Sequence, residues 1–288
     1  LVVSIVSVIL LIIYYFYLNA NVDIKKRYKC SYVVITGATG GIGTVLTQKM
    51  LQKGLNVIAI GRNQQLLDKL CLNTAPNCKV VPFLFDFTDD LLTFAPRFEK
   101  MLQLNQIPKQ EIGLCYSNIG YSDYKLYHES SYEEKIKFFQ ANLGSHTLMG
   151  DYFVRLFMER KCRSGLCFTS SAEAYIIGHK VSMYHVSKRA LTALGSALHV
   201  EYPQFDVLTV HPTAVTGRVL SEFSKKVGNK SEFKAVAVTE ADVVQHLVSR
   251  LGKMSHSDVG LSTDVVNIGS RLLGNRGITW IHKVIGGM

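Results

Sequence analysis

A β-rich run that ends in clustered glycines is the feature that most constrains the fold. Residues 31–36 read SYVVIT, and the stretch 37–43, GATGGIG, follows directly before a helical pattern that continues to Gly54. Strand, glycine turn and helix in this order are typical of a dinucleotide-binding turn in a parallel α/β sheet. The glycines let the backbone approach a pyrophosphate, and the helix directs free N–H groups and its positive dipole end toward that charge. The sequence therefore predicts a nucleotide site here.

Further apolar, β-rich segments alternate with helical patterns along the chain. They occupy residues 56–60, 79–85, 112–117, 166–170 and 207–211. Strands that alternate with helices favour parallel pairing. The pattern predicts an α/β fold, a Rossmann-like doubly wound parallel sheet of about seven strands, with ligands at the carboxyl ends of the strands. A chain of 288 residues, 48% of them hydrophobic, suffices for one such domain.

The N-terminal segment is apolar enough for a membrane. Residues 1–18 read LVVSIVSVILLIIYYFYL, without a charge, and a basic group follows at Lys25, Lys26, Arg27 and Lys29. At about 1.5 Å per residue, such a helix reaches roughly 27 Å, the hydrocarbon thickness of a thin bilayer. The positive-inside rule places the following domain in the cytosol. The sequence thus predicts a transmembrane anchor over 1–20, a basic juxtamembrane linker over 21–30 and the α/β domain over 31–288.

Bulk properties limit the alternatives. The apolar run is also compatible with a cleaved signal peptide, since Leu18-Asn19-Ala20 fits a cleavage site. Outside the basic group, the cations behind the net charge of +10 are scattered, which favours a solvated surface over a nucleic-acid groove. The six cysteines show neither CxxC pairs nor metal-type spacing with histidine. We therefore expect free thiols, a reducing compartment and no metal site.

Two charged residues follow strands on the cofactor side. Arg62 comes directly after Gly61, where an acidic residue would hold the ribose hydroxyls of NAD. An arginine there pairs with a 2′-phosphate, so NADP(H) is the predicted cofactor, and a surface arginine that caps a turn is the alternative. Asp86, after segment 79–85, is placed either to accept a hydrogen bond from the adenine amino group or to cap a helix.

A tyrosine and a lysine one helical turn apart indicate acid–base chemistry. Tyr184 and Lys188 share one face of a helical stretch that runs to about Glu201. A nearby ammonium favours phenolate over phenol and lowers the pKa of a tyrosine from about 10 toward neutral pH. The same spacing is common on ordinary amphipathic helices, so the pair needs partners elsewhere in the chain.

Those partners bring a family resemblance. The stretch TGATGGIG at 36–43, Asn142, Ser171 and the run Tyr184-His185-Val186-Ser187-Lys188 occur in this order, and Ser171 precedes Tyr184 by thirteen residues. The arrangement strongly resembles the short-chain dehydrogenase/reductase family over roughly residues 31–260. This resemblance implies an NADP(H)-dependent oxidoreductase on a Rossmann-type sheet.

The resemblance also implies a role for each matching residue. Tyr184 would donate a proton to the substrate carbonyl oxygen, and Ser171 would hydrogen-bond the same oxygen. Lys188 would hold the nicotinamide ribose and depress the pKa of Tyr184, while Asn142 would position a water for the proton relay. NADPH would supply the hydride. Besides Tyr184 and Lys188, the implied cofactor contacts are Thr36, Gly37, Gly41, Ile42, Gly43, Arg62, Asp86 and Phe87 beside the adenine, Asn118, Pro212 and Thr216.

Three positions depart from the family pattern. Ser117-Asn118-Ile119-Gly120 stands where the family has Asn-Asn-Ala-Gly, Pro212-Thr213 replaces Pro-Gly, and no glycine follows closely after Ser171. The first two departures affect the fine geometry of the cofactor site. The third changes the loop 172–180 at the expected substrate mouth. None of them removes a reacting group.

Within the family, the chain is similar to an endoplasmic-reticulum membrane group. The similarity rests on the anchor, the basic stretch, GATGGIG, Asp86-Phe87 and the tail that begins at Gly260. That group contains very-long-chain ketoacyl-CoA reductases and hydroxysteroid dehydrogenases. It implies a lipid-like carbonyl substrate, here a 3-ketoacyl-CoA or a ketosteroid, a location in the endoplasmic reticulum membrane and a catalytic domain that faces the cytosol.

Several alternatives stay open at this point. A 3-ketosphinganine reductase is the nearest alternative within the family, and a catalytically silent NADP(H)-binding scaffold or sensor is the alternative without catalysis. The loop 213–234 mixes apolar residues with cations, which suits either a lipid tail with an anionic head or a plain amphipathic surface. The long helical stretches near 131–160 and 182–203 resemble the faces that pair in this family, so a homodimer is expected.

Overall fold

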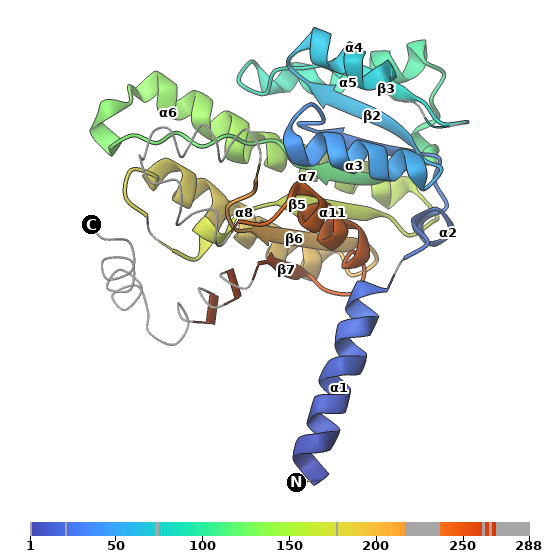
Figure 1. Cartoon of the computed structure of the whole chain (residues 1–288). Helices are drawn as coiled ribbons and strands as arrows, with labels where there is room; N and C mark the ends of the chain where they lie inside the picture. Colours follow the sequence, from blue (N-terminus) through green and yellow to red (C-terminus); the bar gives the residue numbers. More distant parts are fainter. Residues whose placement is uncertain are drawn as a thin grey trace.

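The domain is built on one seven-stranded parallel sheet. The computed structural model describes residues 2–20, 22–72, 75, 77–176, 178–216, 237–260, 263–264 and 267–268. The strands lie in the order β3-β2-β1-β4-β5-β6-β7, and each neighbouring pair is parallel (Figure 1). Their bounds are β1 Tyr32–Thr36, β2 Asn56–Gly61, β3 Val80–Leu84, β4 Ile112–Ser117, β5 Gly165–Thr169, β6 Asp206–Pro212 and β7 His256–Val259. The predicted doubly wound α/β sheet is confirmed.

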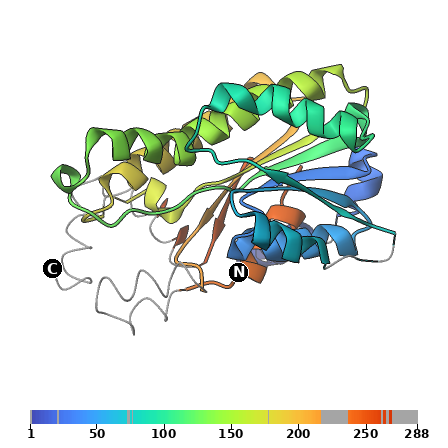
Figure 2. The same ribbon diagram turned by 90° about the horizontal axis from the view of Figure 1, so that it is seen from above.

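Helices cover both faces of this sheet (Figure 2). Residues of α3 (Gly41–Gln52), α4 (Gln64–Leu72) and α11 (Glu240–Ser249) pack in one hydrophobic cluster, and residues of α5 (Phe94–Leu104), α7 (Ser145–Glu159) and α8 (Ser182–Glu201) pack in the other. Successive side chains of a strand point to opposite faces, so Val33 and Ile35 belong to the first cluster and Val34 to the second. A strand buried on both faces reads as a continuous apolar run, which is why the sequence pattern found six of the strands.

The strand order changes direction between β1 and β4. From β1 the chain winds outward to β2 and β3, and then crosses back to β4 on the other side of β1. The loops after β1 and β4 therefore leave in opposite directions and open a crevice at the carboxyl ends of these strands. Such a switch point is where open α/β sheets bind ligands.

The N-terminal residues form a helix that projects from the domain (Figure 1). Helix α1 spans Val2–Asn19, and its aromatic residues 14–17 are exposed. The ammonium of Lys253 donates to the carbonyl oxygens of Tyr17 and Ala20 at 2.7 and 2.9 Å, which ties the C-terminal end of α1 to the domain. Within the residues whose side chains the structure describes, no helix is both long and apolar enough to cross a membrane. The membrane anchor therefore stays a prediction.

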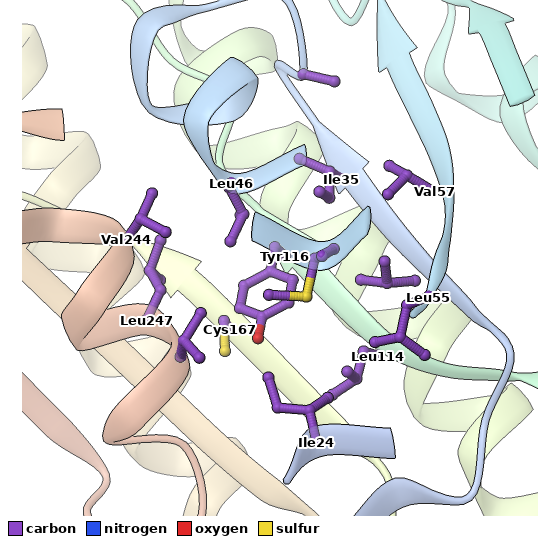
Figure 3. Packing of buried hydrophobic residues seen from close by; sticks show 14 of the residues in the cluster. Ile24, Ile35, Leu46, Leu55, Val57, Leu114, Tyr116, Cys167, Val244 and Leu247 are labelled. Atoms are coloured by element: carbon purple, nitrogen blue, oxygen red, sulfur yellow. The ribbon is translucent and has the colours of Figure 1, made fainter. Parts of the chain in front are cut away.

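The segment predicted as a linker contains a short helix that packs on the domain. Helix α2 spans Ile24–Tyr28, and both of these terminal side chains are buried. Figure 3 shows Ile24 among core residues from β1, α3, β4 and α11, next to Tyr116 and Cys167. The hydrophobic core thus begins before residue 31. All six cysteines are free, as the sequence predicts.

Candidate active site

The glycine turn between β1 and α3 has no room for side chains. Gly37 adopts a φ of +62°, in the left-handed region that favours glycine. A Cβ atom on Gly43 would lie 2.1 Å from the carbonyl oxygen of Gly37, closer than any real contact. Gly41 and Ile42 open helix α3, whose first N–H groups have no partner within the helix. A backbone this bare at a helix N-terminus fits a pyrophosphate.

The loop after β4 is fastened across this turn. The hydroxyl oxygen of Thr36 accepts hydrogen bonds from the backbone N–H groups of Asn118 and Ile119, at 2.9 and 3.1 Å. The hydroxyl of Thr169, at the end of β5, donates to Oδ1 of Asn118 at 2.9 Å. Three neighbouring strand ends are therefore connected at the switch point, and Thr36 and Asn118 support the site through structure.

A buried histidine that sequence reasoning missed holds the same loop. Nε2 of His146 lies 2.9 Å from the carbonyl oxygen of Ile119, and Nδ1 lies 2.7 Å from the hydroxyl of Ser117. A carbonyl oxygen can only accept, so Nε2 carries the proton, and Nδ1 of the neutral ring accepts from Ser117. Burial lowers the pKa of His146 well below its usual value, with a further contribution from the charge of Lys188. Ser117, which departs from the family pattern, thus has a specific partner.

Asn142 lies in a π-helical turn, Gln140–Gly144, between α6 (Tyr132–Phe139) and α7. Its side chain is fully buried and accepts from the backbone N–H of Tyr121 at 3.0 Å. A Cβ atom on Gly120 would lie 3.0 Å from Oδ1 of Asn142 and 3.2 Å from Nζ of Lys188. Asn142 and Lys188 therefore meet at Gly120, at the carboxyl end of β4.

Lys188 is a buried cation on α8. Its ammonium donates to the carbonyl oxygen of Thr169 at 2.9 Å and lies 5.5 Å from the ring centroid of Tyr184. Burial lowers the pKa of Lys188 to about 8, since the charged form loses its hydration. At neutral pH most of the lysine is still protonated, so a positive charge stands beside the tyrosine ring.

Tyr184 departs from the sequence-based expectation. A lowered pKa was predicted from the neighbouring lysine, yet burial raises the pKa of Tyr184 to about 12, a hydrogen bond with the Ser171 side chain lowers it in part, and the charge of Glu173 raises it further. The hydroxyl is therefore a phenol across the neutral range and can act as a proton donor. Ser171, Tyr184 and Lys188 come together at the end of β5, as their order in the chain predicts.

The residues predicted to surround the adenosine lie at the ends of β2 and β3. Arg62 is exposed directly after β2, and its charge lowers the pKa of Tyr121 while that of Asp86 raises it, so all three lie near one another. Asp86 accepts from the backbone and hydroxyl of Thr88, both at 2.9 Å, and therefore caps a turn. The ring of Phe87 is 1% exposed and packs on Phe85 and Phe94. Its ring is thus a core element and does not offer a stacking surface for adenine.

The end of β6 contributes the remaining predicted contacts. Pro212 ends the strand, and the backbone of Thr216 pairs with Val238. The hydroxyl of Thr216 donates to Oε2 of Glu240 at 3.2 Å, and Oε1 of Glu240 lies 2.9 Å from the place that a Cβ would take on Gly41. Sequence reasoning missed this carboxylate beside the glycine turn. Residues 217–236, which hold most of the predicted substrate loop, and most of the tail after Gly260 lie outside the described residues.

Comparison with known proteins decides the family. A family model described as short chain dehydrogenase matches residues 31–232, which include the glycine turn, Asn142, Ser171, Tyr184 and Lys188. The chain belongs to the short-chain dehydrogenase family. This confirms the resemblance drawn from the motifs.

Curated relatives of this short-chain dehydrogenase are enzymes of lipid metabolism and related proteins. A very-long-chain 3-oxoacyl-CoA reductase-like protein of Arabidopsis thaliana is 28% identical over 205 residues, 68% of this chain and 63% of the relative. A very-long-chain 3-oxoacyl-CoA reductase of Caenorhabditis briggsae is 39% identical over 108 residues, 36% and 33% of the two chains. An inactive hydroxysteroid dehydrogenase-like protein 1 of Pongo abelii is 26% identical over 189 residues, 64% and 55%. The match spans less than two thirds of each of these relatives.

Solved structures share the fold. A 7β-hydroxysteroid dehydrogenase has a TM-score of 0.74 at 16% identity, with 91% of this chain and 99% of that chain covered. The closed form of a serine dehydrogenase complexed with NADP+ has a TM-score of 0.67 at 22% identity, with 81% and 95% covered. At these identities the likeness establishes the architecture of the sheet and its helices.

Proposed function

We propose that this chain reduces the carbonyl group of a lipid-like substrate with NADPH. The observation that carries the proposal is the convergence of Ser171, Tyr184 and Lys188 at the end of β5, next to Asn142 and the glycine turn. A nucleotide-binding scaffold needs the turn but has no need of a buried phenol beside a buried ammonium. The group therefore supports chemistry as well as binding.

The residues of the chain account for both the proton and the charge. Bound NADPH supplies the hydride that the carbonyl carbon accepts. The Tyr184 phenol donates its proton to the carbonyl oxygen, which yields an alcohol and leaves a phenolate. The ammonium of Lys188 and the hydroxyl of Ser171 stabilise this phenolate, because both can present a donor or a positive charge to it. Asn142, buried beside Lys188, is positioned to hold a water that returns the proton.

The cofactor follows from the ends of β1 and β2. The bare turn at Gly37 and Gly43 fits a pyrophosphate, and the exposed guanidinium of Arg62 is free to pair with the 2′-phosphate of NADPH. Glu240 places a carboxylate close to the same turn. We expect NADPH to bind more tightly than NADH, and Arg62→Ala to remove most of this difference.

The substrate class follows from the relatives and from the N-terminus. Two relatives are named for 3-oxoacyl-CoA reduction and one for similarity to hydroxysteroid dehydrogenases. Helix α1 exposes apolar and aromatic side chains from Ile9 to Tyr17. We propose a 3-ketoacyl-CoA or a ketosteroid as substrate, attachment to the endoplasmic reticulum membrane with the domain in the cytosol, and a homodimer.

The test uses the full chain in detergent, NADPH and a long-chain 3-ketoacyl-CoA, with a ketosteroid in a parallel assay. Loss of NADPH absorbance is followed for the wild type and for Tyr184→Phe, which keeps the ring and removes the proton donor. We expect turnover in the wild type and a loss of at least about 100-fold in the variant, the range of general acid catalysis. Binding of NADPH without turnover of any ketone would instead support the silent scaffold, a candidate that the inactive relative keeps in view.

A further inference from the structure

A glutamate that the proposed chemistry does not use stands next to the reacting pair. Glu173 lies in the short 3-10 helix Ala172–Ala174, two residues after Ser171. Its backbone N–H donates to the Ser171 hydroxyl oxygen at 3.2 Å, and its carbonyl oxygen lies 2.6 Å from Nδ1 of His185, the residue after Tyr184. The backbone of Glu173 is therefore held from both sides by neighbours of the catalytic groups.

The side chain of Glu173, in contrast, has an unused acceptor. Its Oε2 atom is buried and has no hydrogen-bond partner among the described residues. Burial alone raises the pKa of Glu173 to about 7, with no contribution from a cation. The buried carboxylate of Asp206 shows the usual arrangement, since two arginines and a tyrosine hydroxyl bind it. A buried polar atom without a partner costs about 1–3 kcal/mol and calls for a ligand or another explanation.

The carboxyl group lies toward the substrate end of the site. The charge of Glu173 raises the pKa of Tyr184, so the carboxyl is near the phenol that would face the substrate carbonyl. Oε2 also lies 3.3 Å from the place that a Cβ would take on Gly178, within the loop 172–180. This loop is where the sequence departs from the family pattern after Ser171. The third departure therefore introduces a hydrogen-bond acceptor next to the reacting groups.

We propose that Glu173 is a specificity-determining residue that binds a hydrogen-bond donor, an ammonium or a hydroxyl group, on the carbon next to the substrate carbonyl. The inference rests on the proposed function, because it assigns the substrate class of that same site. A ketone without such a donor leaves Oε2 buried and unpaired, whereas a 2-amino or 2-hydroxy ketone satisfies it. Sites that hydrogen-bond a substrate group discriminate strongly against the analogue that lacks the group.

Of the lipid ketones considered above, only one carries this feature. In 3-ketosphinganine an amino group lies on the carbon next to the ketone, while a 3-ketoacyl-CoA has a methylene group there. An ammonium forms a charge-assisted hydrogen bond with a carboxylate, which is roughly twice as strong as a neutral one. We therefore expect the order of preference to be amino ketone, hydroxy ketone and plain ketone, at equal chain length.

The experiment compares three long-chain ketones of equal length that differ only at the neighbouring carbon: amino, hydroxyl or hydrogen. The full chain is assayed with NADPH as wild type, Glu173→Gln and the surface control Glu159→Gln. We expect the wild type and the control to prefer the amino ketone over the plain ketone by about 10- to 100-fold in kcat/KM, the range for hydrogen bonds to charged groups. Glu173→Gln keeps the shape and an acceptor oxygen, so it should lose most of the amino preference and keep much of the hydroxyl preference.

A binding measurement separates this inference from the proposed function. In the Tyr184→Phe background, saturated with NADPH, the affinities of sphinganine and of the matching alcohol without an amino group are compared with and without Glu173→Gln. A Glu173-dependent preference for the amine supports the inference even where no ketone is reduced. Equal affinities, or a Glu173→Gln variant that weakens all ligands by the same factor, would overturn it and leave carbonyl reduction untouched.

Discussion

At the scale of single residues, the site combines a tyrosine with a raised pKa and a lysine with a lowered one. Burial causes both shifts, because it disfavours phenolate and ammonium alike. Tyr184 is then a phenol and Lys188 a partly titrating ammonium near pH 8. This state suits proton donation to a carbonyl, whereas the reverse reaction needs the phenolate as a base.

The direction of these shifts predicts the pH dependence of alcohol oxidation. Ionised Glu173 raises the pKa of Tyr184, so Glu173→Gln removes a like charge above about pH 7 and lowers that pKa. The rise of kcat/KM for oxidation with NADP+ should therefore occur at lower pH in the variant. At pH 9 we expect a gain of less than about tenfold, since one whole pKa unit corresponds to tenfold. A profile that moves to higher pH, or one that Glu159→Gln moves equally, would contradict this account.

His146 gives a second prediction at this scale. His146→Leu removes the partners of the Ser117 hydroxyl and the Ile119 carbonyl, while Tyr184 and Lys188 keep their own contacts. We expect the KM for NADPH to rise about tenfold, the effect of one lost buried hydrogen bond, with kcat changed less than about threefold. His146→Gln offers a donor and an acceptor and should restore much of the KM. A fall in kcat at unchanged KM would assign His146 to the chemical step instead.

At the scale of elements, the turn between β1 and α3 decides how closely the cofactor can approach. A Cβ on Gly43 would lie 2.1 Å from the Gly37 carbonyl oxygen, whereas one on Gly40 would lie 3.3 Å from the same atom. Gly43→Ala must shift the start of α3, and we expect it to weaken NADPH binding about 10- to 100-fold, as overpacking of a tight contact does. Gly40→Ala should change it less than about threefold. Fluorescence titration with NADPH measures both, and equal effects would show that the turn adapts.

The elements also show how far sequence reasoning reaches. Buried strands such as β1 and β4 are predictable because they are continuous apolar runs, and six predicted segments lie within about two residues of the observed strands. Strand β7, His256–Val259, was missed because its polar residues alternate with single buried positions at the sheet edge. Tyr184 and Lys188 are predictable from helical spacing. His146 and Glu173 are not, because their roles depend on which backbone groups the fold brings next to them.

At the scale of the whole molecule, two sets of contacts join the N-terminal helices to the domain. Lys253 binds the last carbonyl groups of α1, and Asp206, at the start of β6, binds α2. The Asp206 carboxylate accepts from Arg27 at 2.8 Å, from the Tyr28 hydroxyl at 2.9 Å and from Arg163. The direction in which α1 leaves the domain is therefore set by contacts at the ends of the strands opposite the active site.

This junction yields a prediction for stability. Desolvation alone would raise the pKa of Asp206, but hydrogen bonds from Arg163, Arg27 and Tyr28 outweigh it and hold the pKa below its usual 3.8. For a carboxyl with a depressed folded-state pKa, the stabilisation is present above the unfolded value and is lost as the pH falls through the folded value. Asp206→Asn should therefore lower the free energy of unfolding at pH 7 by about 2–3 kcal/mol. That is less than for a fully buried pair, because both arginines are partly exposed.

Urea unfolding of the full chain, followed by circular dichroism, measures this loss at pH 7 and again below pH 3.8, where the wild type and Asp206→Asn should converge. Asp151→Asn is the matched control, since Asp151 pairs with Arg155 on the exposed face of α7 and should contribute less than about 0.5 kcal/mol. Limited trypsin digestion adds a local readout, because release of α2 in Asp206→Asn exposes its Lys25-Lys26-Arg27 run to cleavage. A variant as stable as the wild type, with α2 still protected, would mean that the apolar contacts of Ile24 and Tyr28 alone hold α2, and that the ion pairs only set its register.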